Sequence, residues 1–121
     1  MDYPPSLSED VKRRAFLADN GEIGVPPADA GSFLDACRAD SVEVLGWELW
    51  VVNHVWGLDN SPVAAAGCWC GGIPMQGADF PAVVCGDGDG DETLRQLTAF
   101  DFSEVQVAWL PHVRVNFTLA L

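Results

Sequence analysis

The stretch from Val42 to Val52, VEVLGWELWVV, constrains the fold of this chain more than any other segment. It is rich in β-branched and aromatic residues and too short to cross a bilayer, which is typical of a central β-strand. A regular strand would place Glu43 and Glu48 on opposite faces, because successive side chains alternate. Gly46 lies between them, and an isolated strand glycine often marks a bulge that shifts the facing by one residue. We therefore predict that both glutamates share one face of the sheet. The alternative is that one glutamate lies in solvent at the end of the strand and the other lies at the rim of the sheet.

Two helices are predicted before this strand. Ser6 and Glu9 have the spacing of a capping box, which predicts a helix that ends near Asp19. The second predicted helix spans about residues 27–39, because Pro27 suits a first turn and apolar residues follow at i, i+3, i+4 and i+7. These apolar residues are Ala30, Phe33, Leu34 and Cys37.

Antiparallel strands are predicted to follow the central strand at residues 42–52. Turn residues at 56–62 and an apolar return over 63–70 predict a hairpin that covers residues 42–70. A short strand is expected over Phe80–Cys85, and a short helix capped by Asp91 follows it.

Alternating apolar residues then indicate strand character from Val105 to Trp109 and from Val113 to Leu121. Because no long linker or repeat interrupts the chain, residues 1–121 are predicted to form a single α+β domain. It would hold an antiparallel sheet of about four to five strands, two N-terminal helices packed on the sheet and one short later helix.

The charge balance limits the class of partner. Eighteen Asp and Glu face six Lys and Arg in 121 residues, for a net charge of −12. Such a field repels nucleic acid and anionic lipid and speeds encounter with a basic protein. The alternative is that the acidity only keeps a small protein soluble. Without a signal sequence or a membrane-length apolar run, and with four cysteines best interpreted as thiols, the chain is expected to be cytoplasmic.

Metal and catalytic motifs are weak. Asp87, Asp89 and Asp91 match the first, third and fifth positions of a calcium loop, but Glu92 stands where glycine is required. Cys68 and Cys70 lack a second ligand pair at zinc spacing, so neither a metal nor a cofactor is expected.

Two histidines, His54 and His112, have no motif partner nearby in the sequence. Without a nucleophile elbow, a phosphate loop or a dinucleotide fingerprint, no catalytic residue is predicted and the chain is not expected to be an enzyme.

Trp47 and Trp50 would face opposite sides of a regular strand. Both could pack under helices or loops, or one of them could form an aromatic anchor in a protein interface.

The segment from Gly21 to Asn53 resembles immunity proteins of bacterial polymorphic-toxin systems. The resemblance lies in the lead-in Glu22-Ile23-Gly24, the helix at Pro27, and the strand motif Leu45-Gly46-Trp47-Glu48-Leu49-Trp50. It implies a non-enzymatic inhibitor that is made beside a toxin, often a nuclease with a basic surface, and blocks it by tight binding.

The leading hypothesis is therefore a cytoplasmic immunity protein that binds a cognate toxin with a basic surface, and neither nucleic acid nor a membrane. The predicted partner contacts are Trp47, Glu48, Trp50, Asp59, Asp87, Asp89, Asp91 and Glu92. The alternative hypothesis is a small-ligand or metal-binding module; the oligomeric state and the strand order stay open.

Overall fold

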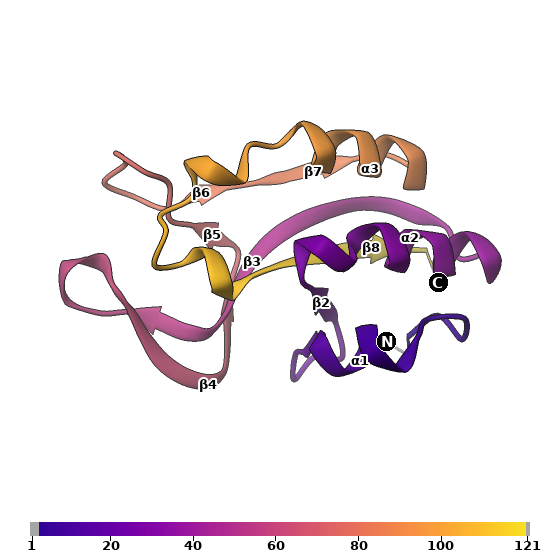
Figure 1. The fold of residues 1–121 in the computed structure, drawn as a ribbon, viewed down its shortest axis with the longest axis horizontal. Helices are drawn as coiled ribbons and strands as arrows, with labels where there is room; N and C mark the ends of the chain where they lie inside the picture. The colour runs from indigo at the N-terminus through magenta and orange to yellow at the C-terminus, as the bar shows by residue number, and fades with distance from the viewer. Residues whose placement is uncertain (1–2, 121) are drawn as a thin grey trace.

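Strand β3 (Val44–Trp56) runs through the middle of the sheet in the computed structural model, which describes residues 3–120 (Figure 1). One edge of β3 pairs with β8 (Val113–Leu119), beyond which lie β2 (Ile23–Val25) and β1 (Phe16–Leu17). Along the other edge, residues 46–48 of β3 pair with β7 (Cys85–Asp87), and residues 51–56 pair with β4 (Pro62–Cys70). A separate two-stranded sheet joins β5 (Gly72–Ile73) to β6 (Ala82–Val83), and all of these pairings are antiparallel.

The α+β class, the antiparallel sheet and the hairpin at residues 42–70 are thus confirmed. The main sheet has six strands where about four to five were predicted. The additional strands β1, β2 and β7 have two or three residues each, which is too short for an alternating pattern to show in the sequence.

A bulge in β3 is confirmed beside Gly46. The pairing with β8 shifts register between Val44 and Gly46, so Leu45 has no opposite residue on β8. Val44 and Trp47 both enter the same buried core although they are three residues apart, which requires this shift. Glu48 follows Trp47 and so points to the opposite face of the sheet. Glu43 precedes β3 and lines a pocket with Leu34 and Arg38 of α2, on the side of the helices, so the predicted sharing of one face by the two glutamates is not seen.

Three helices share the core with one face of the sheet. They are α1 (Glu9–Arg14), α2 (Ala30–Ala39), which follows the 3₁₀ turn η1 (Pro27–Asp29), and α3 (Gly90–Ala99). The packing is direct: the rings of Phe33 on α2 and Phe117 on β8 stack with centroids 4.9 Å apart. Within residues 3–120, none of the helices combines the length and the apolar character that crossing a membrane requires.

The predicted first helix is wrong at both ends. Its N-cap is Ser8, whose side chain accepts a hydrogen bond from the Val11 amide, whereas Ser6 donates to the carboxylate of Asp40. The helix ends at Arg14, because the following residues pair with β2 as strand β1. The second predicted helix is confirmed, since η1 and α2 together cover residues 27–39.

Two later predictions are also corrected. Asp89 caps α3 in place of Asp91, because its side chain accepts from the Glu92 amide. The segment from Val105 to Trp109 is no regular strand: a single bridge joins Val105 to Met75, and 3₁₀ turns flank it. These turns are η3 (Phe102–Glu104) and η4 (Leu110–His112); a further one, η2 (Leu58–Asn60), closes the β3–β4 hairpin.

The opposite face of the sheet holds a second, smaller core. Phe16, Ala18, Trp50 and Val52 are buried there, and Trp69 covers them with its ring centroid 4.4 Å from that of Trp50. Strand β3 therefore buries side chains on both faces.

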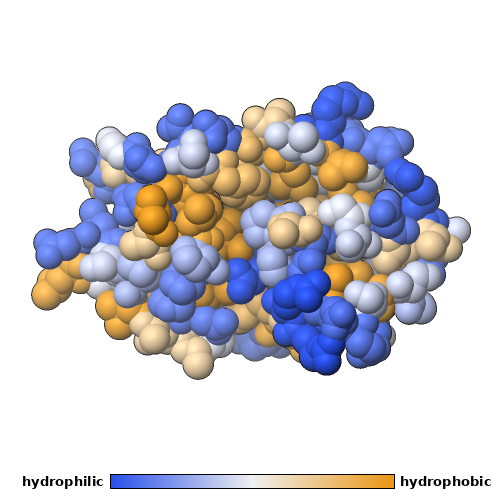
Figure 2. Space-filling model, in the orientation of Figure 1, coloured by the Kyte–Doolittle hydropathy of each residue, from blue (hydrophilic) through white to orange (hydrophobic). Residues whose placement is uncertain are grey.

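Exposed apolar side chains gather where the β3–β4 hairpin, the β5–β6 sheet and the segment before β8 meet. We call this surface the apolar end; its large exposed side chains are Val55, Leu58, Val63, Phe80, Val83, Val107 and Leu110. Figure 2 shows orange atoms gathered in the left half of the view, on the side of the molecule that carries β4, β5 and β6 in Figure 1.

The contact between β3, β7 and α3 has no room for a side chain at Gly86. A Cβ there would overlap Oε1 of Gln96 and Nε1 of Trp47, which form a hydrogen bond of 2.8 Å. We expect Gly86→Ala to lower the free energy of unfolding by about 1–3 kcal/mol, measured by urea denaturation. Gly31→Ala on α2, where a Cβ meets nothing within 4 Å, is the matched control and should stabilise by up to about 1 kcal/mol. Equal effects of the two substitutions would contradict the packing described.

Candidate functional site: an acidic groove on the sheet

A groove of about 340 Å³ crosses the face of the sheet that points away from the helices. We call it the acidic groove; its lining residues are Glu22, Leu45, Gly46, Trp47, Glu48, Cys85, Gly86, Asp87, Asn116 and Thr118. The strand register explains this set: Glu48 lies between Asn116 on β8 and Cys85 on β7, and Gly46 lies between Thr118 and Asp87.

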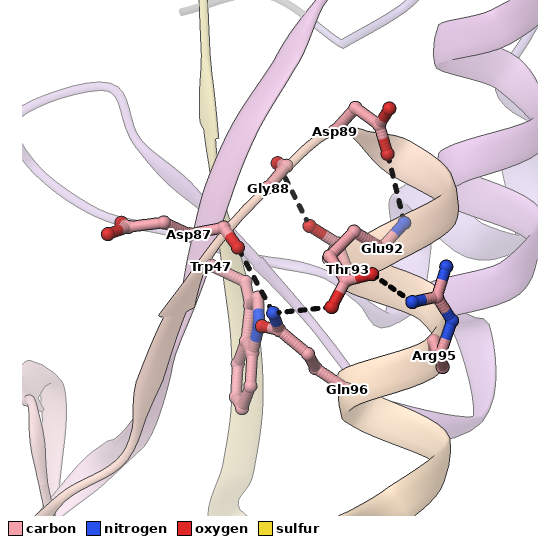
Figure 3. A network of polar contacts seen from close by, with 8 residues as sticks. All are labelled: Trp47, Asp87, Gly88, Asp89, Glu92, Thr93, Arg95 and Gln96. Atoms are coloured by element: carbon pink, nitrogen blue, oxygen red, sulfur yellow. Dashed lines mark hydrogen bonds and ion pairs between the residues drawn. The ribbon is translucent and has the colours of Figure 1, made fainter.

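Three carboxylates from different elements meet in the acidic groove. Glu48 is oriented by the buried indole of Trp50, whose Nε1 donates to Oε1 over 2.6 Å. Glu22 is held by Asn20, whose Nδ2 donates to Oε2 over 2.8 Å. No side-chain hydrogen bond or ion pair within residues 3–120 engages the carboxylate of Asp87, and Figure 3 shows it directed away from α3. Each of the three thus keeps at least one carboxylate oxygen available to a donor from outside.

The cations of this protein do not neutralise the acidic groove. Five of the six Lys and Arg form ion pairs elsewhere: Lys12 with Glu9, Arg13 with Asp10, Arg14 with Asp29, Arg38 with Asp91 and Arg95 with Glu92.

The sixth cation, Arg114, lies two residues before Asn116 on β8. Its Nη1 donates to the backbone carbonyl oxygens of Pro111 and Val113, not to a groove carboxylate. Burial lowers the pKa of its guanidinium from the ordinary value, against the opposing charge of Asp29. The acidic groove therefore keeps a net negative charge.

Three members of the predicted contact set, Trp47, Glu48 and Asp87, line the acidic groove, and Glu48 and Asp87 supply carboxylates to it. Asp91 pairs with Arg38. Asp89 caps α3, and Glu92 pairs with Arg95 and accepts from Gln96 (Figure 3). These three carboxylates of the predicted contact set therefore bind groups within the protein itself. Asp59 is exposed at η2 on the hairpin turn and is not part of the groove.

Trp47 and Trp50, the predicted aromatic contacts, are both buried in this structure. Their relative exposures are 5% and 0%, so neither indole can enter a partner's pocket while the protein stays folded. Trp47 packs in the core under the helices and Trp50 in the smaller core on the opposite face. This burial agrees with the alternative interpretation, in which both rings pack inside the protein.

Sequence reasoning missed the contributions of Glu22, Asn116 and Thr118. The alternation in the last strand places residues 114, 116 and 118 on one face, but nothing in the sequence indicated that this face lies beside Glu48. Glu22 reaches the groove through β2, whose three residues carry no strand pattern.

The two histidines form a stacked pair, which their sequence positions did not predict. The ring centroids of His54 and His112 are 3.5 Å apart with an interplanar angle of 21°. Nδ1 of His54 lies 3.0 Å from the carbonyl oxygen of Val52 and therefore donates to it. Burial, His54 and Arg114 all lower the pKa of His112 from its ordinary value of 6.5. No carboxylate or nucleophile within residues 3–120 is hydrogen-bonded to either ring, and no cluster of three metal-ligating side chains occurs in that range.

Comparison with protein-family models, with curated proteins and with solved structures finds no match to this chain.

We expect Glu48→Ala to destabilise the protein by about 1–3 kcal/mol, because the buried Nε1–H of Trp50 would lose its acceptor. Glu48→Gln should cost less, since an amide oxygen can accept the same hydrogen bond. Urea denaturation followed by tryptophan fluorescence measures both values. Equal losses in the two variants would show that the hydrogen bond does not hold Trp50 in place.

The lowered pKa of His112 predicts a pH-dependent stability. The unfolded state binds a proton more readily than the folded state, so stability should fall as the pH drops below 6.5. His112→Gln should remove this component, seen as the difference in Tm between wild type and variant from about pH 7.5 to about pH 5.5. Parallel Tm profiles would overturn the assignment to His112.

Proposed function

We propose that this protein is a non-catalytic immunity protein that binds a basic toxin domain through the acidic groove and neutralises it in the cytoplasm. The observation that carries the proposal is the set of three carboxylates, Glu22, Glu48 and Asp87, none of which has an ion-pair partner among residues 3–120. The resemblance of Gly21–Asn53 to immunity proteins supports the same assignment, because the segment contributes Glu22 and Glu48 to the groove.

The geometry suits recognition of Arg and Lys side chains. A guanidinium or ammonium group forms charge-assisted hydrogen bonds with carboxylates, and Thr118 adds an exposed hydroxyl to the same face. Asn116 is buried beneath this surface, where its Nδ2 donates to the carbonyl oxygen of Ile23 over 3.0 Å. The groove is formed by paired strands, so its carboxylates are held by a rigid backbone and lose little freedom on binding.

The net charge adds a long-range component. A chain of −12 attracts a cationic domain at distances up to the Debye length, about 10 Å at 0.1 M salt. Association should therefore be fast at low salt and slow as salt is added.

The first test is co-expression with the product of the gene immediately upstream. Growth inhibition by that product, relieved by this chain and accompanied by co-purification, supports the proposal. A harmless neighbour that does not co-purify contradicts it.

With the toxin in hand, the variant Glu22→Gln/Glu48→Gln/Asp87→Asn should lower the association rate constant at least about tenfold and flatten its salt dependence. The control Asp35→Asn/Asp59→Asn/Asp79→Asn removes the same number of negative charges, but from exposed positions outside the groove. Surface plasmon resonance between about 50 and 500 mM NaCl measures both variants. Equal slowing by the two variants would mean that net charge alone, and not the groove, drives binding.

A further inference from the structure

We propose that the apolar end is the interface of a symmetric dimer of this chain. The inference is independent of toxin binding, since it uses other side chains and a different physical interaction. Its starting point is the distribution of charge along the sequence.

Three segments that form the apolar end contain no Asp, Glu, Lys or Arg. They are residues 60–78, 80–86 and 105–113. All 24 charged residues lie outside these segments, in a chain where charged residues make up 20% of the sequence. Asp59, Asp79, Asp87, Glu104 and Arg114 stand at their borders, and Asp59, Asp79 and Glu104 would form the rim of an interface.

Contacts between these segments make them one surface. Nε1 of Trp109 donates to the carbonyl oxygen of Asn60 over 2.7 Å, which joins η4 to the hairpin turn. The backbone N–H of Gln106 donates to the carbonyl oxygen of Pro74 over 2.8 Å, and a β-bridge joins Met75 to Val105. These contacts attach the segment before β8 to the start of the β5–β6 connection. The apolar end is therefore built on hydrogen-bonded backbone and is not a set of loose loops.

The exposure of its side chains is large. Phe80 is 81% exposed, Val107 is 75% and Val83 is 74%, although none of them is needed to cover the cores. Soluble monomers seldom expose contiguous apolar surface of this kind without an interaction to use it. A standard interface takes about 800 Å² from each partner, which is roughly an eighth of the 6627 Å² surface of this chain.

The charge pattern selects a second copy as the occupant. Two chains of −12 repel each other at every acidic face, and the apolar end is the surface where that repulsion is weakest. In a two-fold symmetric contact each residue near the axis faces its own copy, so a charged patch would oppose itself whereas an uncharged apolar patch does not. A basic partner would be drawn to the acidic groove instead.

The contact is expected to be a packing of side chains and not a continuous sheet through the edge strand β4. The pairing of β4 with β3 breaks register at Asn53, and Gly67 in β4 has a φ of +81°. Such a bulge bends an edge away from regular strand addition.

Sedimentation velocity of the purified full chain over a range of concentrations tests the proposal. We expect a species of about twice 13.0 kDa that becomes more populated as NaCl is raised, because salt screens the like charges of the two copies. The salt dependence is thus opposite in sign to that expected for the toxin.

The variant Val83→Asp/Val107→Asp should raise the dimer dissociation constant at least about tenfold while the far-UV circular dichroism and Tm stay close to wild type. The matched control is Leu17→Asp/Leu94→Asp, which adds the same number of charges at exposed large apolar residues outside the apolar end, and it should leave the constant unchanged. A wild-type chain that stays at 13.0 kDa at all concentrations overturns the proposal. So does a dimer that both variants weaken equally. Because no toxin is present, neither result bears on the acidic groove.

Discussion

The fold depends on the burial of β3 on both faces. Leu49 and Val51 enter the core under the helices, while Trp50 and Val52 enter the smaller core on the opposite face. A strand with hydrophobic residues on both sides reads as an unbroken apolar run, which is why VEVLGWELWVV stands out in the sequence. The bulge at Leu45 shifts the alternation of side chains along β3 by one residue. As a result, Val44 and Trp47 share one core and Glu48 points toward the other face. Without the extra residue, either Val44 or Trp47 would leave the core.

The acidic groove follows from this strand and from the needs of Trp50. A fully buried indole N–H requires an acceptor, and the residue two positions earlier on the same face is the nearest side chain that can supply one. Glu48 fills that role with one oxygen and keeps the other toward the groove. One carboxylate thus serves both the smaller core and the candidate binding surface. In the proposed binding mode, Glu48 therefore serves both stability and partner recognition. Glu48→Gln separates the two, because the amide oxygen can still accept the hydrogen bond while the charge is lost.

Particular residues show what the sequence could and could not predict. The strand predicted over Val42–Val52, its bulge, the helix at residues 27–39 and the last strand all carried periodic or positional signals. Each has a counterpart in the structure, with the central strand observed over Val44–Trp56. The groove required knowledge of register: Asp87 and Thr118 lie on either side of Gly46 only because β7 and β8 pair with opposite edges of β3. The roles of Asp89 and Asp91 could not be predicted either, since Asp89 caps α3 and Asp91 binds Arg38, which is 53 residues away. Side-chain partners at such separations leave no mark in local sequence patterns.

The segregation of charge makes the two proposed surfaces compatible. In the two proposals, a basic partner binds the carboxylates of the acidic groove, and the second copy binds the apolar end through side chains from segments without charge. Association of two copies would place twice the net charge of −12 on one particle, which strengthens the field that a cationic domain meets. That gain carries a cost, because the same charges oppose the approach of the copies, and only apolar burial can offset the repulsion. The absence of charged residues from three separate segments, brought together by the fold, is the arrangement that keeps this cost lowest.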